Sequence, residues 1–98
     1  MEFDLCEAVQ NFGKGVGNQN RYLILDELLK GSRTVTQISE KVNLSQPATS
    51  QHLRVLKTCQ LVHDEKKGKE VIYSLNVPYL MQIFKELTVA LQALKSSE

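Results

Sequence analysis

The stretch "LSQPATSQHLRVLKTCQL", residues 44–61, combines helical spacing of apolar residues with many small polar side chains. Ser45 is a favourable N-cap, and Pro47 falls in the first turn, where its missing N–H costs little. On a helical wheel one side collects Ser45, Thr49, His52, Leu53 and Leu56, and the other collects Gln46, Pro47, Ser50, Gln51 and Arg54. The stretch therefore predicts an amphipathic helix over 46–58 with a hydrogen-bonding, slightly basic outward face.

The size and composition of the chain indicate one ordinary globular domain, residues 1–98. It has 98 residues, of which 42% are hydrophobic and 23% charged, and its net charge is +1. No apolar run approaches the roughly 18 residues that cross a bilayer. The acidic start "MEFDLCEAVQ" lacks the features of a signal peptide. We therefore expect a cytoplasmic protein without a membrane partner.

Two helices are expected before the quoted stretch. Apolar residues at helical spacing predict the first over 5–16, and Gly15 and Gly17 are expected to interrupt it. The second is expected over 19–30 after an N-cap at Asn18. Its predicted buried side consists of Ile24, Leu25, Leu28 and Leu29.

A third helix is predicted to start at Thr34, because Gln37 lies three residues on and completes a capping box. Residues 34–58 then form two short helices joined by a tight turn, which is the pattern of a helix-turn-helix. In such a motif the second helix enters the major groove of DNA. The candidate DNA-binding residues on it are Ser45, Gln46, Pro47, Ser50, Gln51, Arg54 and Lys57. Glutamine can pair with adenine, arginine with guanine or phosphate, and serine with phosphate oxygens.

The apolar periodicity changes to two after Cys59-Gln60. "LVHDE" and "EVIYSL" read as strands around the turn "KKGK", which predicts a hairpin over 61–75. Its tip would place Lys66, Lys67 and Lys69 over a phosphate or a minor groove. Residues 31–75 hold seven basic and four acidic side chains, so positive charge is modestly concentrated in this part of the chain.

A last helix is predicted over 77–95, where Val77, Leu80, Phe84, Leu87, Leu91 and Leu94 alternate spacings of three and four. This pattern is typical of a coiled-coil-like seam. We interpret it as a dimer helix, with burial against the protein's own core as the alternative. The expected fold is mainly α with a small β-hairpin, in the order ααααββα.

Residues 17–75, above all "LSQPATSQHLRVL", resemble the ArsR/SmtB family of winged helix-turn-helix repressors. The resemblance implies a dimeric transcriptional repressor that binds a double-stranded, pseudo-palindromic DNA operator through helix 46–58. It also implies a homodimer formed by the first and last helices, 5–16 and 77–95. The expected interface residues are Leu5, Val9, Phe12, Leu80, Phe84, Leu87, Leu91 and Leu94.

The chain departs from the family in several places. The third helix, "TVTQISEKV", has no cysteine, and the last helix, "VPYLMQIFKELTVALQAL", has no histidine or aspartate, so we expect no metal site and no cofactor. Gln60 replaces a common glycine, so the end of helix 46–58 is expected to be less sharply capped. Asp64 and Glu65 precede the hairpin tip and would repel phosphate.

Functions other than DNA binding have less support in the sequence. No pattern of nucleophile and base indicates an enzyme. Cys6 and Cys59 are the only candidates for a redox switch, although cysteine is also a common small buried residue. A winged helix that docks proteins without reading DNA is the alternative function. A protein-docking helix would usually present aromatic or aliphatic anchors, which helix 46–58 does not carry on its outward face.

Overall fold

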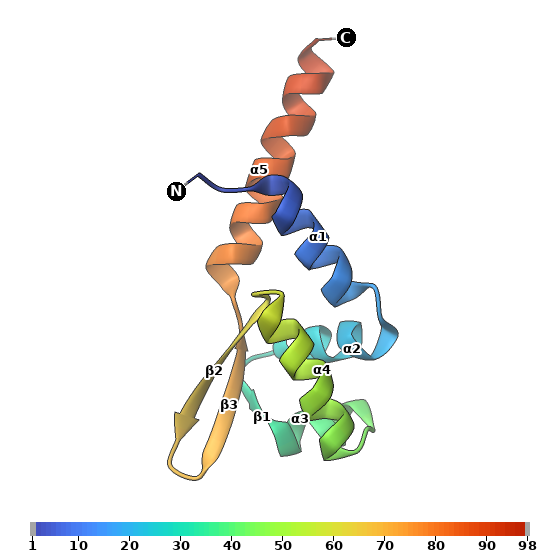
Figure 1. Ribbon diagram of the computed structural model, residues 1–98, viewed down its shortest axis with the longest axis vertical. Helices are drawn as coiled ribbons and strands as arrows, with labels where there is room; N and C mark the ends of the chain where they lie inside the picture. Colours follow the sequence, from blue (N-terminus) through green and yellow to red (C-terminus); the bar gives the residue numbers. More distant parts are fainter. Residues whose placement is uncertain (1, 98) are drawn as a thin grey trace.

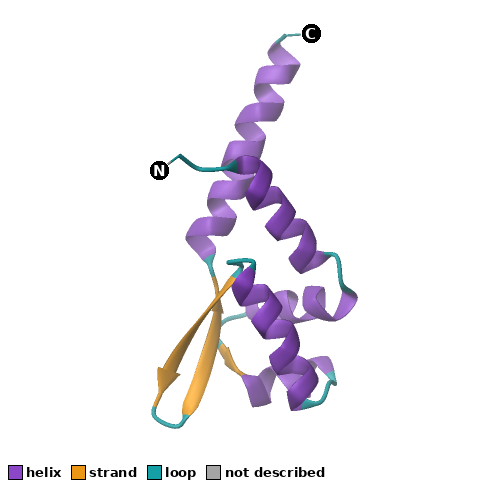
Figure 2. Ribbon diagram, viewed as in Figure 1, coloured by secondary structure: helices purple, strands orange, loops and turns teal. Residues whose placement is uncertain are grey.

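The helix expected from residues 46–58 lies at the centre of the fold, and its main contacts are with α2, α3 and β2. The computed structural model describes residues 2–97. Figure 1 shows the elements in order along the chain, and Figure 2 shows that the strands lie together on one side of the lower helices. The elements are α1 (Leu5–Val16), α2 (Gln19–Leu28), β1 (Arg33–Thr34), α3 (Val35–Val42), α4 (Gln46–Thr58), β2 (Val62–Lys67), β3 (Glu70–Leu75) and α5 (Val77–Ser96).

Each helix begins at a polar residue whose side chain accepts a hydrogen bond from a backbone N–H of the first turn. The N-caps are Asp4, Asn18, Thr34, Ser45 and Asn76. These bonds satisfy amides that a helix leaves unpaired at its start. The sequence prediction is confirmed for the starts at Asn18, Thr34 and Ser45, including the capping box of Thr34.

The hairpin predicted over 61–75 is confirmed, and it pairs with one further strand. The sheet has the order β1-β3-β2, and all its pairs are antiparallel. The loop between β2 and β3 has a positive φ of 62° at Gly68, as a tight hairpin turn requires. The predicted order ααααββα is confirmed for the five helices and the hairpin, and the structure adds β1, because a two-residue strand has no periodicity that a sequence can reveal.

The hydrophobic core lies between α2, α3 and α4 and includes Leu61, which follows α4. Ile24, Ile38, Leu53, Leu56 and Leu61 are all completely buried there. Since α4 contributes its inward residues to this core, its opposite side is left for solvent. The core thus orients α4 in the molecule.

The buried side of the second helix is smaller than predicted. Ile24, Leu25 and Leu28 are buried, but Leu29 is 73% exposed. The helix α2 ends at Leu28, two residues earlier than expected, and the C-cap Leu29 keeps helical dihedrals, so its side chain lies at the edge of the buried arc. The prediction that Leu29 is buried was therefore wrong.

Gly15 lies inside α1, so the prediction that it interrupts the helix was wrong. A Cβ at this position would collide with Cδ1 of Leu61 and lie 3.3 Å from Cδ2 of Leu56. Glycine is needed here because α1 passes closely over the end of α4 and over Leu61, two residues after the C-cap of that helix. Gly17, in contrast, does end the helix, and its N–H donates to the Gly13 carbonyl.

The two terminal helices pack against each other. Ala8 of α1 and Ile83 of α5 are each 1% exposed, and the Phe12 and Phe84 rings form an edge-to-face pair at 5.4 Å. Figure 1 shows that α5 then extends well past the start of α1. The outer half of α5 is therefore not covered by its own chain.

Replacing Gly15 with alanine should lower the free energy of unfolding by about 1–3 kcal/mol, since the new methyl group overpacks the contact with Leu61. Urea denaturation followed by circular dichroism measures this change. The matched control is Gly13→Ala in the same helix, where a Cβ meets nothing within 4 Å. That substitution should stabilise the helix by about 0.5–1 kcal/mol. Equal effects of the two substitutions would contradict the close contact.

Candidate nucleic-acid interface

The turn between α3 and α4 is held by a left-handed residue and a serine cap. Asn43 has a φ of 58°, and the Leu44 N–H donates to the Ser39 carbonyl over 3.1 Å. Ser45 Oγ accepts from the Ala48 N–H at 3.2 Å. Because both helix ends at this turn are satisfied by local hydrogen bonds, the angle between α3 and α4 is well defined. Residues 34–58 therefore form the predicted helix-turn-helix.

The two sides of α4 are separated largely as the helical wheel predicted, but Ser45, which the wheel placed on the inward side, is exposed, and His52 is only half-buried. Thr49, Leu53 and Leu56 are buried, and Thr49 Oγ1 donates to the Ser45 carbonyl at 2.9 Å. The candidate DNA-binding residues of this region are all exposed: Ser45, Gln46, Pro47, Ser50, Gln51, Arg54 and Lys57. The exposed face carries amides, hydroxyls and cations but no large apolar side chain apart from proline.

One residue of this face is tied to the preceding helix. Gln46 Nε2 donates to Thr36 Oγ1 at 3.1 Å, and both residues are exposed. The contact restricts the rotamer of Gln46 and brings Thr36 of α3 to the edge of the same surface. The sequence pointed to Gln46 but not to Thr36, because a contact between two helices leaves no mark on the spacing within either one.

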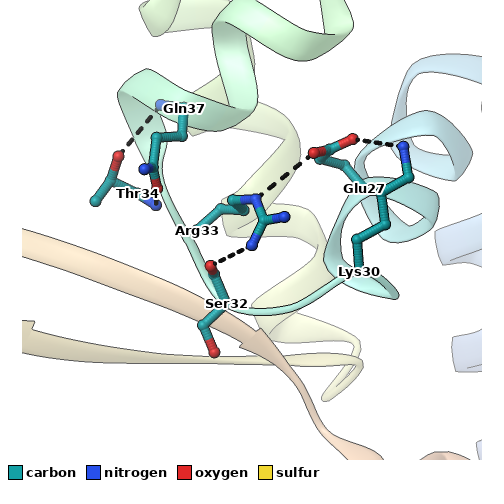
Figure 3. Close-up of polar contacts among 6 residues, drawn as sticks. All are labelled: Glu27, Lys30, Ser32, Arg33, Thr34 and Gln37. Atoms are coloured by element: carbon teal, nitrogen blue, oxygen red, sulfur yellow. Dashed lines mark hydrogen bonds and ion pairs between the residues drawn. The ribbon is translucent and has the colours of Figure 1, made fainter.

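The start of the helix-turn-helix is anchored to α2 by a nearly buried carboxylate (Figure 3). Glu27 Oε2 lies 3.2 Å from Lys30 Nζ, and Glu27 Oε1 lies 3.6 Å from Arg33 Nε. Arg33 is in β1, directly before Thr34, the N-cap of α3. The ion pair therefore connects the end of α2 to the residue directly before the motif. No role for Glu27 could be predicted from the sequence.

The hairpin, residues 62–75, lies beside α4 and carries the three lysines that were predicted to contact DNA. Lys66, Lys67 and Lys69 are exposed near its tip. Lys57 of α4 does not point freely to solvent, because its Nζ lies 2.9 Å from Asp64 Oδ2 of β2. Asp64 was expected only to repel phosphate, and the structure adds that a cation of α4 is paired with it.

The end of α4 is sharply capped, so the prediction of a weaker cap at Gln60 was wrong. Gln60 adopts the left-handed conformation with a φ of 65°. Its N–H donates to the Lys57 carbonyl at 3.0 Å, and the Leu61 N–H donates to the Leu56 carbonyl at 3.0 Å. This is the hydrogen-bond pattern that usually has glycine at the left-handed position. Asn76 Nδ2 also donates to the Gln60 carbonyl at 2.8 Å.

The two cysteines lie in different environments. Cys59 is 2% exposed and belongs to the core at the end of α4, whereas Cys6 is exposed on α1 and its Sγ accepts a hydrogen bond from Gln10 Nε2. Both thiols are free. A redox role for either one stays a prediction.

The residues predicted for the dimer interface lie on α1 and α5. Leu5, Phe12, Leu80 and Leu87 are half-buried, while Val9, Phe84, Leu91 and Leu94 are 40–61% exposed. The stripe on α5 is thus only partly covered by the protein's own core.

Within residues 2–97, the histidine, cysteine, aspartate and glutamate side chains form no group of three that could hold a metal ion. Over the same range, every helix is too short or too polar to cross a membrane.

The helix-turn-helix, the adjacent hairpin and the flanking helices together define a winged helix-turn-helix protein, with the hairpin as its wing. Residues 18–64 match the family model described as bacterial regulatory protein, arsR family. The transcriptional repressor SdpR of Bacillus subtilis is 38% identical over 72 residues, which cover 74% of this chain and 80% of SdpR. The chain therefore belongs to the arsR family, and it is a transcriptional regulator rather than an enzyme.

Solved structures agree with this assignment. The crystal structure of NolR from Sinorhizobium fredii superimposes with a TM-score of 0.69 at 34% identity, covering 87% of this chain and 85% of NolR. The solution structure of a homodimeric winged helix-turn-helix DNA-binding domain from Mycobacterium bovis gives a TM-score of 0.72 at 27% identity, covering 94% of this chain and 86% of that domain. The winged helix-turn-helix fold predicted from the sequence is confirmed.

Replacing Gln60 with glycine should raise the free energy of unfolding by about 0.5–1 kcal/mol, because glycine adopts a positive φ without the Cβ strain of glutamine. Thermal unfolding followed by circular dichroism measures the gain. Gln60→Val is the opposing variant, since a β-branched residue tolerates this conformation poorly. A valine variant as stable as the glycine variant would argue against the left-handed backbone at this joint.

Proposed function

We propose that this regulator is a homodimeric repressor that binds double-stranded DNA with α4 in the major groove. The observation that carries the proposal is the exposed polar face of α4, held at a defined angle by the capped turn after α3. One α-helix fits the major groove of B-DNA, and residues near its N-terminus reach base edges. A DNA-binding regulator of this kind would act in the cytoplasm.

The side chains of this face suit both parts of DNA recognition. Gln51 and Gln46 carry amides that can pair with adenine, and Arg54 can pair with guanine or a phosphate. Ser45 and Ser50 suit phosphate oxygens near the N-terminus of the helix. Lys66, Lys67 and Lys69 of the wing would lie along the neighbouring backbone. The alternative of a protein-docking helix is less well supported, because this face lacks aromatic and aliphatic anchors.

The exposed apolar surface of α5 supports assembly with a second copy. Met81, Phe84, Leu91 and Leu94 are each more than half exposed. An apolar hollow of about 210 Å³, lined by residues of α1, α2, β3 and α5, has Phe84 in its wall. A monomer rarely leaves so much apolar surface in water. A twofold dimer would cover it and would present two α4 helices to two half-sites.

Two half-sites related by a twofold axis make the expected operator pseudo-palindromic, with centres about one helical turn or a multiple of it apart. Footprinting of the purified protein on the chromosomal region around its own gene is the direct test. We expect a protected segment with twofold sequence symmetry, and protection that falls steeply with salt. Protection of no segment, or of all DNA equally, would contradict a sequence-specific repressor.

Arg54→Ala should weaken binding to this operator by about 1–3 kcal/mol, since it removes a candidate base or phosphate contact. Fluorescence anisotropy with a labelled duplex measures the affinity. Lys85→Ala is the control, because it removes one positive charge from an exposed position on α5, away from α4. Wild-type affinity in the Arg54 variant would argue against the proposed face.

Leu91→Glu should convert the dimer to a monomer, because it would bury a carboxylate in an apolar interface. Sedimentation equilibrium measures the mass directly. Gln82→Glu adds the same charge to an exposed position on the opposite side of α5 and should leave the dimer intact. A dimeric Leu91 variant would show that the stripe on α5 is not the interface.

A further inference from the structure

The wing carries no net charge of its own, although it is proposed to lie against a polyanion. Its cations Lys66, Lys67 and Lys69 are matched in number by three acidic residues, Asp64, Glu65 and Glu70. Phosphate binding requires a locally positive surface. The charge balance of this part of the surface must therefore depend on residues outside the hairpin.

Asp64 is the acid of this group that is directed toward α4. It lies opposite Tyr73 in the antiparallel register and is two residues from the buried Val62, so the three share one face of the sheet. Tyr73 packs against the core beneath this face. Lys66 is two residues further along the strand and belongs to the same face, closer to the tip.

Lys57 reaches Asp64 from the last turn of α4. The distance from Lys57 Nζ to Asp64 Oδ2 is 2.9 Å, and the two side chains are 56% and 30% exposed. A pair with this exposure adds little to folding stability, because water screens it and ordering two side chains costs entropy. The contribution of the pair is therefore expected in binding rather than in folding.

We propose that Lys57 acts as a charge-masking residue, which neutralises Asp64 and thereby leaves the wing with the net positive charge that phosphate binding needs. The proposal rests on the DNA binding inferred above and adds a role for one ion pair in it. Without Lys57, the Asp64 carboxylate would stand uncompensated on the α4 side of the wing, beside Lys66. The carboxylate would then cancel the attraction of a wing lysine for the phosphate backbone of DNA.

The competing possibility is that Lys57 itself contacts a phosphate. In that case a substitution at Asp64 could not restore the operator affinity lost with Lys57, because the contact between Lys57 and the phosphate would still be absent. If Lys57 instead neutralises Asp64, substituting both residues should restore operator affinity, because no uncompensated carboxylate is left on the wing. A double substitution separates the two.

The experiment measures operator affinity by fluorescence anisotropy for Lys57→Met, Asp64→Asn and the double variant. Lys57→Met should weaken binding about threefold to tenfold at ~0.1 M salt, and this difference should shrink at higher salt as screening increases. Adding Asp64→Asn should recover most of the lost affinity. Asp64→Asn alone should bind at least as tightly as the wild type, because it leaves Lys57 without an internal partner.

A matched control tests whether net charge alone explains the recovery. Lys57→Met combined with Glu7→Gln has the same net charge as the wild type, but Glu7 is an exposed residue of α1. This double variant should still bind the operator as weakly as Lys57→Met alone. Full recovery by it would overturn the proposal in favour of a general charge effect.

Two further outcomes would also overturn the inference. The first is a double variant that binds the operator as weakly as Lys57→Met does, which would indicate that Lys57 contacts a phosphate directly. The second is weaker binding by Asp64→Asn alone, which would mean that the acid assists binding; this readout does not depend on whether a Lys57 variant folds. If the wild-type protein bound no operator, the proposed function itself would fail, and that result is distinct from all of these.

Discussion

The left-handed backbone at Gln60 is the constraint on which the rest of the structure depends. A non-glycine residue pays about 1 kcal/mol for this conformation, and the structure retains it because the joint makes several contacts at once. Leu61 is completely buried directly after it, and Asn76 donates from both its side chain and its backbone to the Gln60 and Leu61 carbonyls. The end of α4, the start of β2 and the start of α5 are thereby held together. The proposed DNA-binding surface and the proposed dimer helix are consequently oriented by one short segment.

The same joint brings charges from separate elements together, and this determines the surface that DNA would meet. A wing neutral by composition lies beside a helix end whose lysine pairs with one of its acids. At the other end of the motif, Glu27 is paired with Lys30 and Arg33. Counting charges along the sequence therefore gives a poor estimate of local potential, because pairing across elements changes which charges remain free. The net charge of +1 is compatible with a nucleic-acid surface for this reason.

Much of the fold could be predicted because its signals are local. The two faces of α4, the caps at Thr34 and Ser45 and the turn at Gly68 each follow from residue types within one or two turns of chain. The predictions failed where the structure of a segment depends on a contact with residues distant in the sequence. The strand β1 exists through its pairing with β3, and Gly15 is required by the approach of Leu61 rather than by a break in α1. For the candidate site, the sequence pointed to residues that the structure shows to be exposed, but it did not reveal the partners of Gln46 and Lys57.

The sequence by itself determined the helices, the two faces of the amphipathic helix α4 and the hairpin, since periodicity and capping are properties of consecutive residues. It also carried enough of the pattern of the arsR family for the fold to be expected. Only the tertiary structure decided that glutamine can occupy the glycine position after α4, that Lys57 pairs with Asp64, and that the outer stripe of α5 stays uncovered. Each of these is a contact, or the lack of one, between segments far apart in the chain. Such contacts depend on how the elements pack, which the order of residues within an element does not specify.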